Sequence, residues 1–305
     1  MAGLLVAFAV GFVAGRLAWL AARPWFAQPG LTRPNYRNHY VPTATGIVLA
    51  LALLLVEGGR TAAATFGLGD DEAAQGARLL TVVAVLGFSL LGAVDDVAGS
   101  GEHRGFRGHL LALATGRVTT GLFKLLGGAA VAVVVVGPLT GLRGPNAMVA
   151  DSPGRLLTDA ALVALAANLG NLLDRRPGRT AKSALACFVL LVALAGAEPA
   201  LSGVAVVVGA AAALLMDDLR ERLMLGDAGA NPLGAALGLG VVMAAAPGAR
   251  DLTAAALLVL NLLGEVVSFT RVIDAVPPLR ALDRLGSLRR GAGAGRPRRG
   301  RRGGG

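Results

Sequence analysis

Hydrophobic residues in this chain come in long blocks rather than in alternation with polar residues, and short polar segments separate the blocks. Blocks of this kind predict helices that lie in lipid. Several are shorter than the roughly 20 residues that a straight span needs. The approximate bounds of all the blocks are 3–22, 43–57, 79–94, 121–138, 156–172, 183–197, 200–216, 232–247 and 252–270. We therefore predict an all-α, polytopic bundle of about nine transmembrane helices.

The composition supports a membrane protein. Hydrophobic residues make up 54% of the 305 residues and charged residues only 16%, whereas a soluble domain carries about 25% charged residues. The first block could be mistaken for a signal peptide, but no basic segment precedes it and no clear cleavage site follows, so we interpret it as a retained helix. Cys187 is the only cysteine, which excludes an intrachain disulfide and a cysteine-based metal site.

Arginine and lysine concentrate in alternate loops, which predicts the orientation. With the N-terminus outside, the inside segments hold 22 of these residues and the outside loops 5. This predicts an N-out, C-in topology. The net charge of +10 could also indicate nucleic-acid binding, but basic inside loops account for it, and we expect no nucleic-acid partner.

Three regions follow from these patterns. A membrane domain covers 1–270, a cytoplasmic segment covers 271–290, and a tail of Gly, Arg and Pro covers 291–305. The tail is predicted to be disordered. It could attract anionic lipid, but the interpretation that we favour is a solvated tail that enforces the topology.

Polar and ionisable residues gather at the helix ends that this topology places inside, where such groups are costly and often functional. They are Asp95, Asp96, Lys124, Asn168, Asn171, Asp174, Asp217, Asp218 and Asp227. Carboxylate-rich sets suit Mg²⁺, which prefers oxygen ligands and neutralises phosphate oxygens. The cations available for phosphate are Lys124, Arg175, Arg176 and Arg179.

Each of these features also has a simpler explanation. The adjacent Asp95 and Asp96 could be a solvated helix cap, the two asparagines could form interhelical hydrogen bonds, and Asp227 could be an N-cap. The glycine-rich turn around Asp227 and Gly229 could instead leave backbone close to an anion at a helix N-terminus. The functional reading gains weight because the topology, derived only from arginine and lysine, places the whole set on one face.

Five segments, in this order, resemble motifs of the polyprenyl-phosphate N-acetylhexosamine-1-phosphate transferase family. YVPTATGIVLA resembles its Pro-Thr-x-Gly-Gly entry to the second helix, GAVDDVAG its Asp-Asp motif, and TTGLFK its lysine segment. NLGNLLD resembles its Asn-x-x-Asn-x-x-Asp motif, and LGDAGANPLGAALG, the most specific match, its Gly-Asp-x-Gly motif. The resemblance covers about residues 36–270.

The resemblance implies Mg²⁺-dependent transfer of a sugar 1-phosphate from a UDP-N-acetylhexosamine to undecaprenyl or another polyprenyl phosphate, with release of UMP. In this family the reaction serves envelope polymers such as peptidoglycan, at the inner face of the bacterial plasma membrane. A homodimer is compatible with it. The resemblance implies catalytic roles for Asp95, Asp96 and Asp174, Mg²⁺ ligation by Asp227 and Asp96, and substrate binding by Lys124, Asn168, Asn171, Arg175, Arg179 and Gly229.

The chain also departs from the family pattern. Gly99 and Pro177 stand where the family has a lysine and a second loop aspartate, and Asp217 stands where the peptidoglycan enzyme has asparagine. The triple-histidine loop is replaced by VIDAVPPLRALDRLG, and a basic tail replaces the tenth helix. These departures weigh against the peptidoglycan enzyme itself. They leave a divergent transferase with another sugar or lipid, or an inactive relative that binds the lipid carrier or acts as a scaffold.

Two further interpretations are weaker. His39, His103 and His109 lie in predicted inside loops, where they could touch phosphate, but a place at the membrane interface explains them more simply. An unrelated transporter is disfavoured because no predicted span carries a charge pair at mid-membrane.

Overall fold

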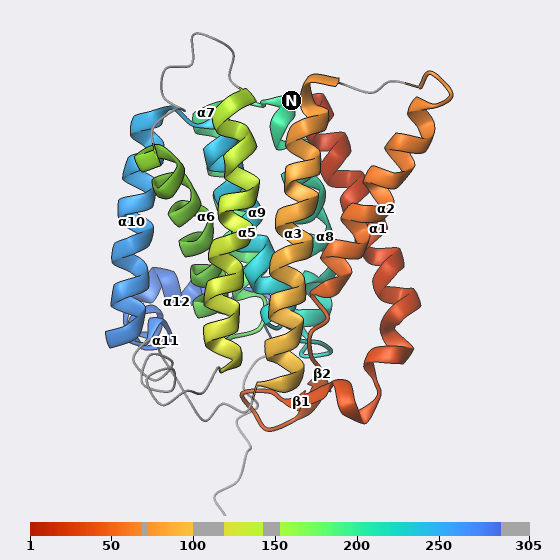
Figure 1. The fold of residues 1–305 in the computed structure, drawn as a ribbon. Helices are drawn as coiled ribbons and strands as arrows, with labels where there is room; N and C mark the ends of the chain where they lie inside the picture. Colours follow the sequence, from red (N-terminus) through yellow and green to blue (C-terminus); the bar gives the residue numbers. More distant parts are fainter. Residues whose placement is uncertain (69–71, 100–118, 143–152, 288–305) are drawn as a thin grey trace, which may run out of the picture.

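The computed structural model describes residues 1–68, 72–99, 119–142 and 153–287 of the chain (Figure 1). His103, His109 and the predicted basic tail 291–305 lie outside these residues. His39 lies inside them, in the turn of a short hairpin, where its backbone carbonyl accepts a hydrogen bond from Asn35 N at 2.8 Å.

Long helices dominate the described residues and run alongside one another (Figure 1). They are α1 (Ala2–Phe26), α2 (Ile47–Ala64), α3 (Glu72–Ala98), α5 (Thr120–Leu142), α6 (Pro153–Leu173), α7 (Arg179–Ala195), α8 (Ser202–Leu219), α9 (Asp227–Ala244) and α10 (Pro247–Val266). Each predicted hydrophobic block overlaps one of them. The smaller elements are η1 (Pro29–Leu31), β1 (Thr32–Pro34), β2 (Tyr40–Pro42), η2 (Pro199–Leu201), α11 (Phe269–Ala275) and α12 (Pro277–Arg284).

Six of the described helices are long and apolar enough to cross a membrane, and the count reaches seven if α10 and the sharply bent α11 form one span. The six are α1, α2, α3, α5, α6 and α8. These helices indicate an all-α, polytopic membrane protein. The predicted block at 252–270 is too long for one helix, because the chain bends by 96° between α10 and α11.

Helices α8 and α9 form the buried centre, and small residues let their neighbours approach closely. A Cβ atom at Gly11 of α1 would lie 2.2 Å from the carbonyl oxygen of Val206 in α8, and one at Gly209 would lie 2.1 Å from that of Phe8. Close approach through glycine is characteristic of helices packed in membranes. On the outside of the bundle, large apolar side chains such as Leu55 and Leu126 are exposed, as contact with lipid requires.

The antiparallel strands β1 and β2 form a hairpin at one end of the bundle, which we call the hairpin end (Figure 1). The Arg33 guanidinium donates to the Val97 carbonyl at 3.3 Å, and Met224 N donates to the Pro42 carbonyl at 2.8 Å. The hairpin therefore packs between the end of α3 and the beginning of α9. At the other end of α6, the buried Asp159 accepts a hydrogen bond from Arg250 at 2.6 Å, which links α6 to α10.

Candidate functional site at the hairpin end

Helix α9 begins at Asp227 after a sharp turn that needs a glycine. Gly226 has φ +67° and ψ −177°, a backbone conformation that residues with a side chain rarely adopt. A Cβ atom there would also lie 2.5 Å from an Asp96 carboxylate oxygen. Gly226 thus directs the chain into α9 while leaving room for Asp96 beside the first turn.

Asp96, at the end of α3, caps the N-terminus of α9. Its two oxygens accept hydrogen bonds from the backbone N–H groups of Asp227 and Ala228, each at 3.0 Å. These N–H groups have no partner within the helix, and a negative charge is favourable at the positive end of the helix dipole. The anion site predicted at this N-terminus therefore holds the protein's own carboxylate, and both oxygens of Asp96 already have partners.

Lys124 of α5 lies between two other carboxylates. Its ammonium donates to Asp95 at 3.0 Å and also to Asp227. The Asn171 side chain of α6 donates to the same Asp227 oxygen at 2.9 Å, and the Thr120 hydroxyl, one turn before Lys124, donates to Asp95. Residues from α3, α5, α6 and α9 therefore meet at one point.

Asp174 lies in the turn after α6, beside the same group. Its carboxylate accepts hydrogen bonds from the Thr180 hydroxyl at 3.0 Å and from the Gly226 backbone N–H. Burial, together with the negative charge of Asp218, raises the pKa of Asp174 to about 8. A carboxylate in this environment holds its proton near neutral pH unless a cation compensates its charge.

The raised pKa of Asp174 predicts a pH dependence of stability. An aspartate titrates near pH 3.9 in an unfolded chain, so the folded state holds this proton more tightly. The resulting stabilisation is complete below the unfolded pKa and is lost as the pH rises through about 8. In buffer with a chelator, Asp174→Asn should therefore lose less thermal stability than the unmodified chain between about pH 6 and about pH 9.

Melting temperatures in detergent at several pH values would measure this effect. Asp274→Asn is the matched control, because the Asp274 carboxylate is 42% exposed and pairs with Arg284 outside the group. The expectation fails if Asp174→Asn and Asp274→Asn follow the same pH profile.

The carboxylates at this site outnumber the ammonium groups that contact them. Lys124 pairs with Asp95 and Asp227, while Asp96 and Asp174 lie beside Asp227 and make no hydrogen bond or ion pair with an ammonium group in the described part of the chain. Carboxylate oxygens of this kind are the ligands that Mg²⁺ prefers. In the described ranges, no three His, Cys, Asp or Glu side chains are arranged to hold a metal by themselves. Mg²⁺ usually takes one or two carboxylates and keeps water or phosphate as its other ligands. Of the two ligands that the resemblance implies, Asp227 could take this role. Both oxygens of Asp96 already accept hydrogen bonds from the start of α9, so Asp95 is the carboxylate that could accompany Asp227.

Asn168, predicted to bind substrate, forms an interhelical contact, the alternative that the sequence also offered; substrate binding by Asn168 stays a prediction. Its side chain donates to the Asn261 side-chain oxygen of α10 at 2.6 Å. Asn261 in turn donates to the carbonyls of Leu165 and Leu257 at 3.1 and 2.8 Å. The two asparagines thus join α6 to α10.

Because interhelical hydrogen bonds in membranes contribute about 0.6 kcal/mol each on average, we expect Asn168→Ala to destabilise the fold by about 1 kcal/mol. Substrate affinity should be unchanged. Thermal unfolding in detergent, together with titration of a UDP-sugar, measures both quantities. A loss of donor affinity with normal stability would restore Asn168 to the substrate site.

Arg179 and Arg175 are in different environments. The buried Arg179 binds Asp283 of α12 through two hydrogen bonds, at 2.7 and 3.0 Å, and donates to the Thr270 hydroxyl at 3.0 Å. Arg175 is exposed, and Arg176 lies over the Tyr36 ring at 4.6 Å. Phosphate binding stays a prediction for these arginines; of the three, only the Arg175 side chain has no hydrogen bond, ion pair or ring contact with the described part of the chain.

Gly229, predicted to leave space for a ligand, packs against another helix. It is buried, and a Cβ atom on it would lie 2.6 Å from the Cα atom of Gly46. Gly229 therefore packs closely against the start of α2, and its predicted part in substrate binding stays a prediction.

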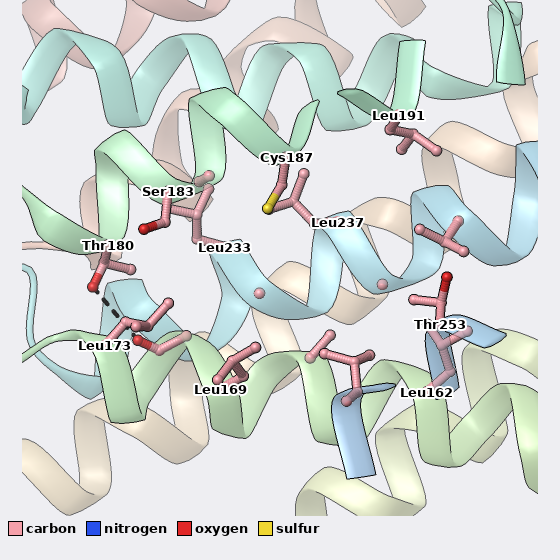
Figure 2. Close-up of a pocket in the computed structure, with 17 residues that line it drawn as sticks. Leu162, Leu169, Leu173, Thr180, Ser183, Cys187, Leu191, Leu233, Leu237 and Thr253 are labelled. Carbon is pink, nitrogen blue, oxygen red and sulfur yellow. Dashed lines mark hydrogen bonds between the residues drawn. The ribbon is translucent and has the colours of Figure 1, made fainter. Parts of the chain in front are cut away.

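An apolar groove opens beside Asp174, between α6, α7, α9 and α10 (Figure 2). Its volume is about 150 Å³, and its walls are mostly leucine, alanine and glycine. Thr180, the hydrogen-bond partner of Asp174, lines its polar end together with Ser183. One end of the apolar groove therefore lies next to the Asp174 carboxylate.

Sequence reasoning missed several residues that build the site. Thr180 carried no motif of its own, although its place six residues after Asp174, across a short turn, put it within reach. Asp283 is 104 residues from Arg179, and no sequence signal connects the two. Asp218, which appeared only as one of many helix-end carboxylates, accepts the Gly178 N–H at 2.9 Å and so fixes the turn before α7.

Chemically, the arrangement can hold a divalent cation where four helix ends meet, next to an apolar groove. In comparisons with known proteins, no protein-family model matches the chain, and no curated protein matches it.

Proposed function

We propose that this chain is a Mg²⁺-dependent phosphoglycosyl transferase, a divergent member of the polyprenyl-phosphate N-acetylhexosamine-1-phosphate transferase family. It moves a sugar 1-phosphate from a UDP-N-acetylhexosamine to undecaprenyl or another polyprenyl phosphate and releases UMP. Its place is the bacterial plasma membrane, in the synthesis of a cell-envelope polymer.

One observation carries the proposal. Side chains from four separate motif segments meet through direct hydrogen bonds, although Asp96 and Asp227 are 131 residues apart in the chain. The same contacts include Lys124 and Asn171, which come from two further motifs. If the four motif segments had no common function, we would not expect their polar side chains to lie in contact at one end of the bundle.

The reaction joins two anions, so the site must position them and offset their repulsion. A bound Mg²⁺ would neutralise charge on the diphosphate of the donor. Asp95 and Asp227 would hold the ion, Lys124 would turn to a phosphate oxygen, and Asp96 would keep the start of α9 in place. Asp174, whose pKa is about 8, would become ionised near neutral pH once a bound Mg²⁺ compensates its charge, and it could then take a proton from the acceptor phosphate.

The apolar groove beside Asp174 offers a place for the acceptor. Its lining of leucine and alanine suits part of an isoprenoid chain, and Thr180 marks the end at which a phosphate would approach the carboxylates. An acceptor bound in this way would lie along α6 and α9 with its charged end at the hairpin end.

The finer topology belongs to this proposal. All nine long helices cross the membrane, with α7, α9 and α10 joining the six helices that are apolar and long enough on their own. The N-terminus is outside and the C-terminus inside, as the distribution of arginine and lysine indicates. The site then faces the cytoplasm, where nucleotide sugars are made.

A second candidate is an inactive relative that binds the lipid carrier. It is favoured by the position of Lys124, which pairs with both Asp95 and Asp227 without a metal, and by Gly99 and Pro177 at two polar positions of the family. Such a protein would bind polyprenyl phosphate and carry out no transfer.

Release of UMP separates the two candidates. We expect purified protein to release UMP from at least one UDP-N-acetylhexosamine when undecaprenyl phosphate and Mg²⁺ are present, and not when either is omitted. Binding of undecaprenyl phosphate without UMP release from any donor would favour the inactive relative. Neither binding nor release would contradict both.

A further inference from the structure

Beyond the candidate site, α11 and α12 lie across the hairpin end of the bundle (Figure 1). Helix α10 runs along the bundle, and α11 starts at Phe269 with its axis bent by 96° from that of α10. Only Val276 separates α11 from α12. If α10 crosses the membrane, α11 therefore runs close to the membrane plane.

Contacts to α7 tether one side of α12. Arg179 holds Asp283 and Thr270, as described above. The Lys182 ammonium donates to the carbonyls of Leu282, Asp283 and Leu285, at 3.1, 2.5 and 3.3 Å. A cation at these last carbonyls also suits the negative end of the helix dipole. Asp283 thus marks the side of α12 that faces the protein.

A different side of α12 is apolar and uncovered. At about 100° per residue, Leu279 and Leu282 lie about 60° apart, on one flank of the helix, next to the side that carries Asp283. They are 44% and 63% exposed, and Leu285 just beyond is 67% exposed. Arg280 and Arg284 lie on the other flank. This separation is typical of helices that lie in a membrane interface.

We propose that α11 and α12 form an interfacial anchor, with the leucine flank of α12 inserted into the headgroup region of the bilayer and anionic phospholipid as the partner. The charge supports a lipid surface: α11 and α12 hold three arginines and two aspartates, and seven more arginines follow them in the sequence, with no further acidic residue. A second copy of the chain at the same flank would bring two such positive segments together, which is unfavourable. The anchor does not depend on the proposed enzymatic function.

Spin labels on the full chain test this placement. In a Cys187→Ser background, Leu282→Cys or Ala281→Cys carries the label, and the protein is reconstituted in vesicles. Ala281 is exposed and lies about 160° from Asp283, away from both the tether and the leucines. We expect position 282 to be more accessible to oxygen, which concentrates in lipid, and position 281 to a water-soluble nickel chelate.

The lipid composition tests the partner. Position 282 should lie deeper in vesicles of phosphatidylcholine with phosphatidylglycerol than in phosphatidylcholine alone. Equal depth in the two would refute the preference for anionic lipid. Greater accessibility to nickel than to oxygen at 282 would refute insertion, and protection from both reagents would show that protein covers the flank instead.

A negative charge introduced on either flank of the helix adds a control for the anchor. With the label at Leu279→Cys, Leu282→Glu should lower the accessibility to oxygen by several-fold, whereas Ala281→Glu should leave it unchanged. Both substituted side chains are exposed, so neither should disturb the packing. An equal effect of the two substitutions would overturn the assignment of the leucine flank to lipid.

Discussion

Asp227→Asn is expected to lower UMP release by about 10²- to 10³-fold, as the removal of one preorganised electrostatic group does in other enzymes. The substitution keeps the size of the side chain and its place at the start of α9. It removes the negative charge that Lys124 contacts and that would hold the metal. The Asp96 cap depends on the backbone N–H of residue 227 and so survives the substitution.

Asp217→Asn is the matched control for this result. Asp217 is also at the hairpin end, but it pairs with Arg16 and Arg222 and makes no contact with Lys124 among the described interactions. We expect Asp217→Asn to keep most of the activity. Activity assays with melting temperatures as a check on folding would decide the matter, and equal losses in the two variants would remove Asp227 from the centre of the site.

The helical architecture could be predicted because lipid imposes one simple rule on the sequence: long apolar blocks must become helices. Boundaries were less predictable. Helix α9 starts at Asp227, five residues before the predicted block, because Asp96 caps its polar first turn. The bend after Val266 was missed because the residues on both sides of it are apolar.

From the sequence, we could predict only that the site residues lie on the same side of the membrane, not which of them touch. The distribution of arginine and lysine predicted that Asp95, Lys124 and Asp227 share one face of the membrane. It contains no information on which side chains form hydrogen bonds with each other. For two predicted substrate-binding residues, the hydrogen-bond partners are far away in the sequence, and no local pattern reveals them. Arg179 donates to Asp283 and Asn168 donates to Asn261, so both side chains join helices.

A substitution at Gly46 is expected to lower both the stability of the fold and the release of UMP. Gly46 caps α2 with φ −62°, an ordinary helical value, so its backbone conformation does not require glycine. Its surroundings do, because a Cβ atom would lie 2.0 Å from the Cα atom of Gly229. The Cα atom is part of the backbone and the Cβ atom is attached directly to it, so neither can move away by side-chain rotation. The helices α2 and α9 would therefore have to separate.

Gly46→Ala should therefore destabilise the protein by about 3 kcal/mol, the upper part of the range for overpacked cores, and should also reduce UMP release because Asp227 is two residues from Gly229. Gly59→Ala in the same helix is the control: nothing lies within 4 Å of a Cβ atom there, and alanine improves helix propensity by up to about 1 kcal/mol. Thermal unfolding and activity of the two variants measure the difference. If Gly46→Ala proves as stable and active as Gly59→Ala, then α9 is not held against α2 as described, and the position of Asp227 beside Asp95 and Asp96 loses its structural basis.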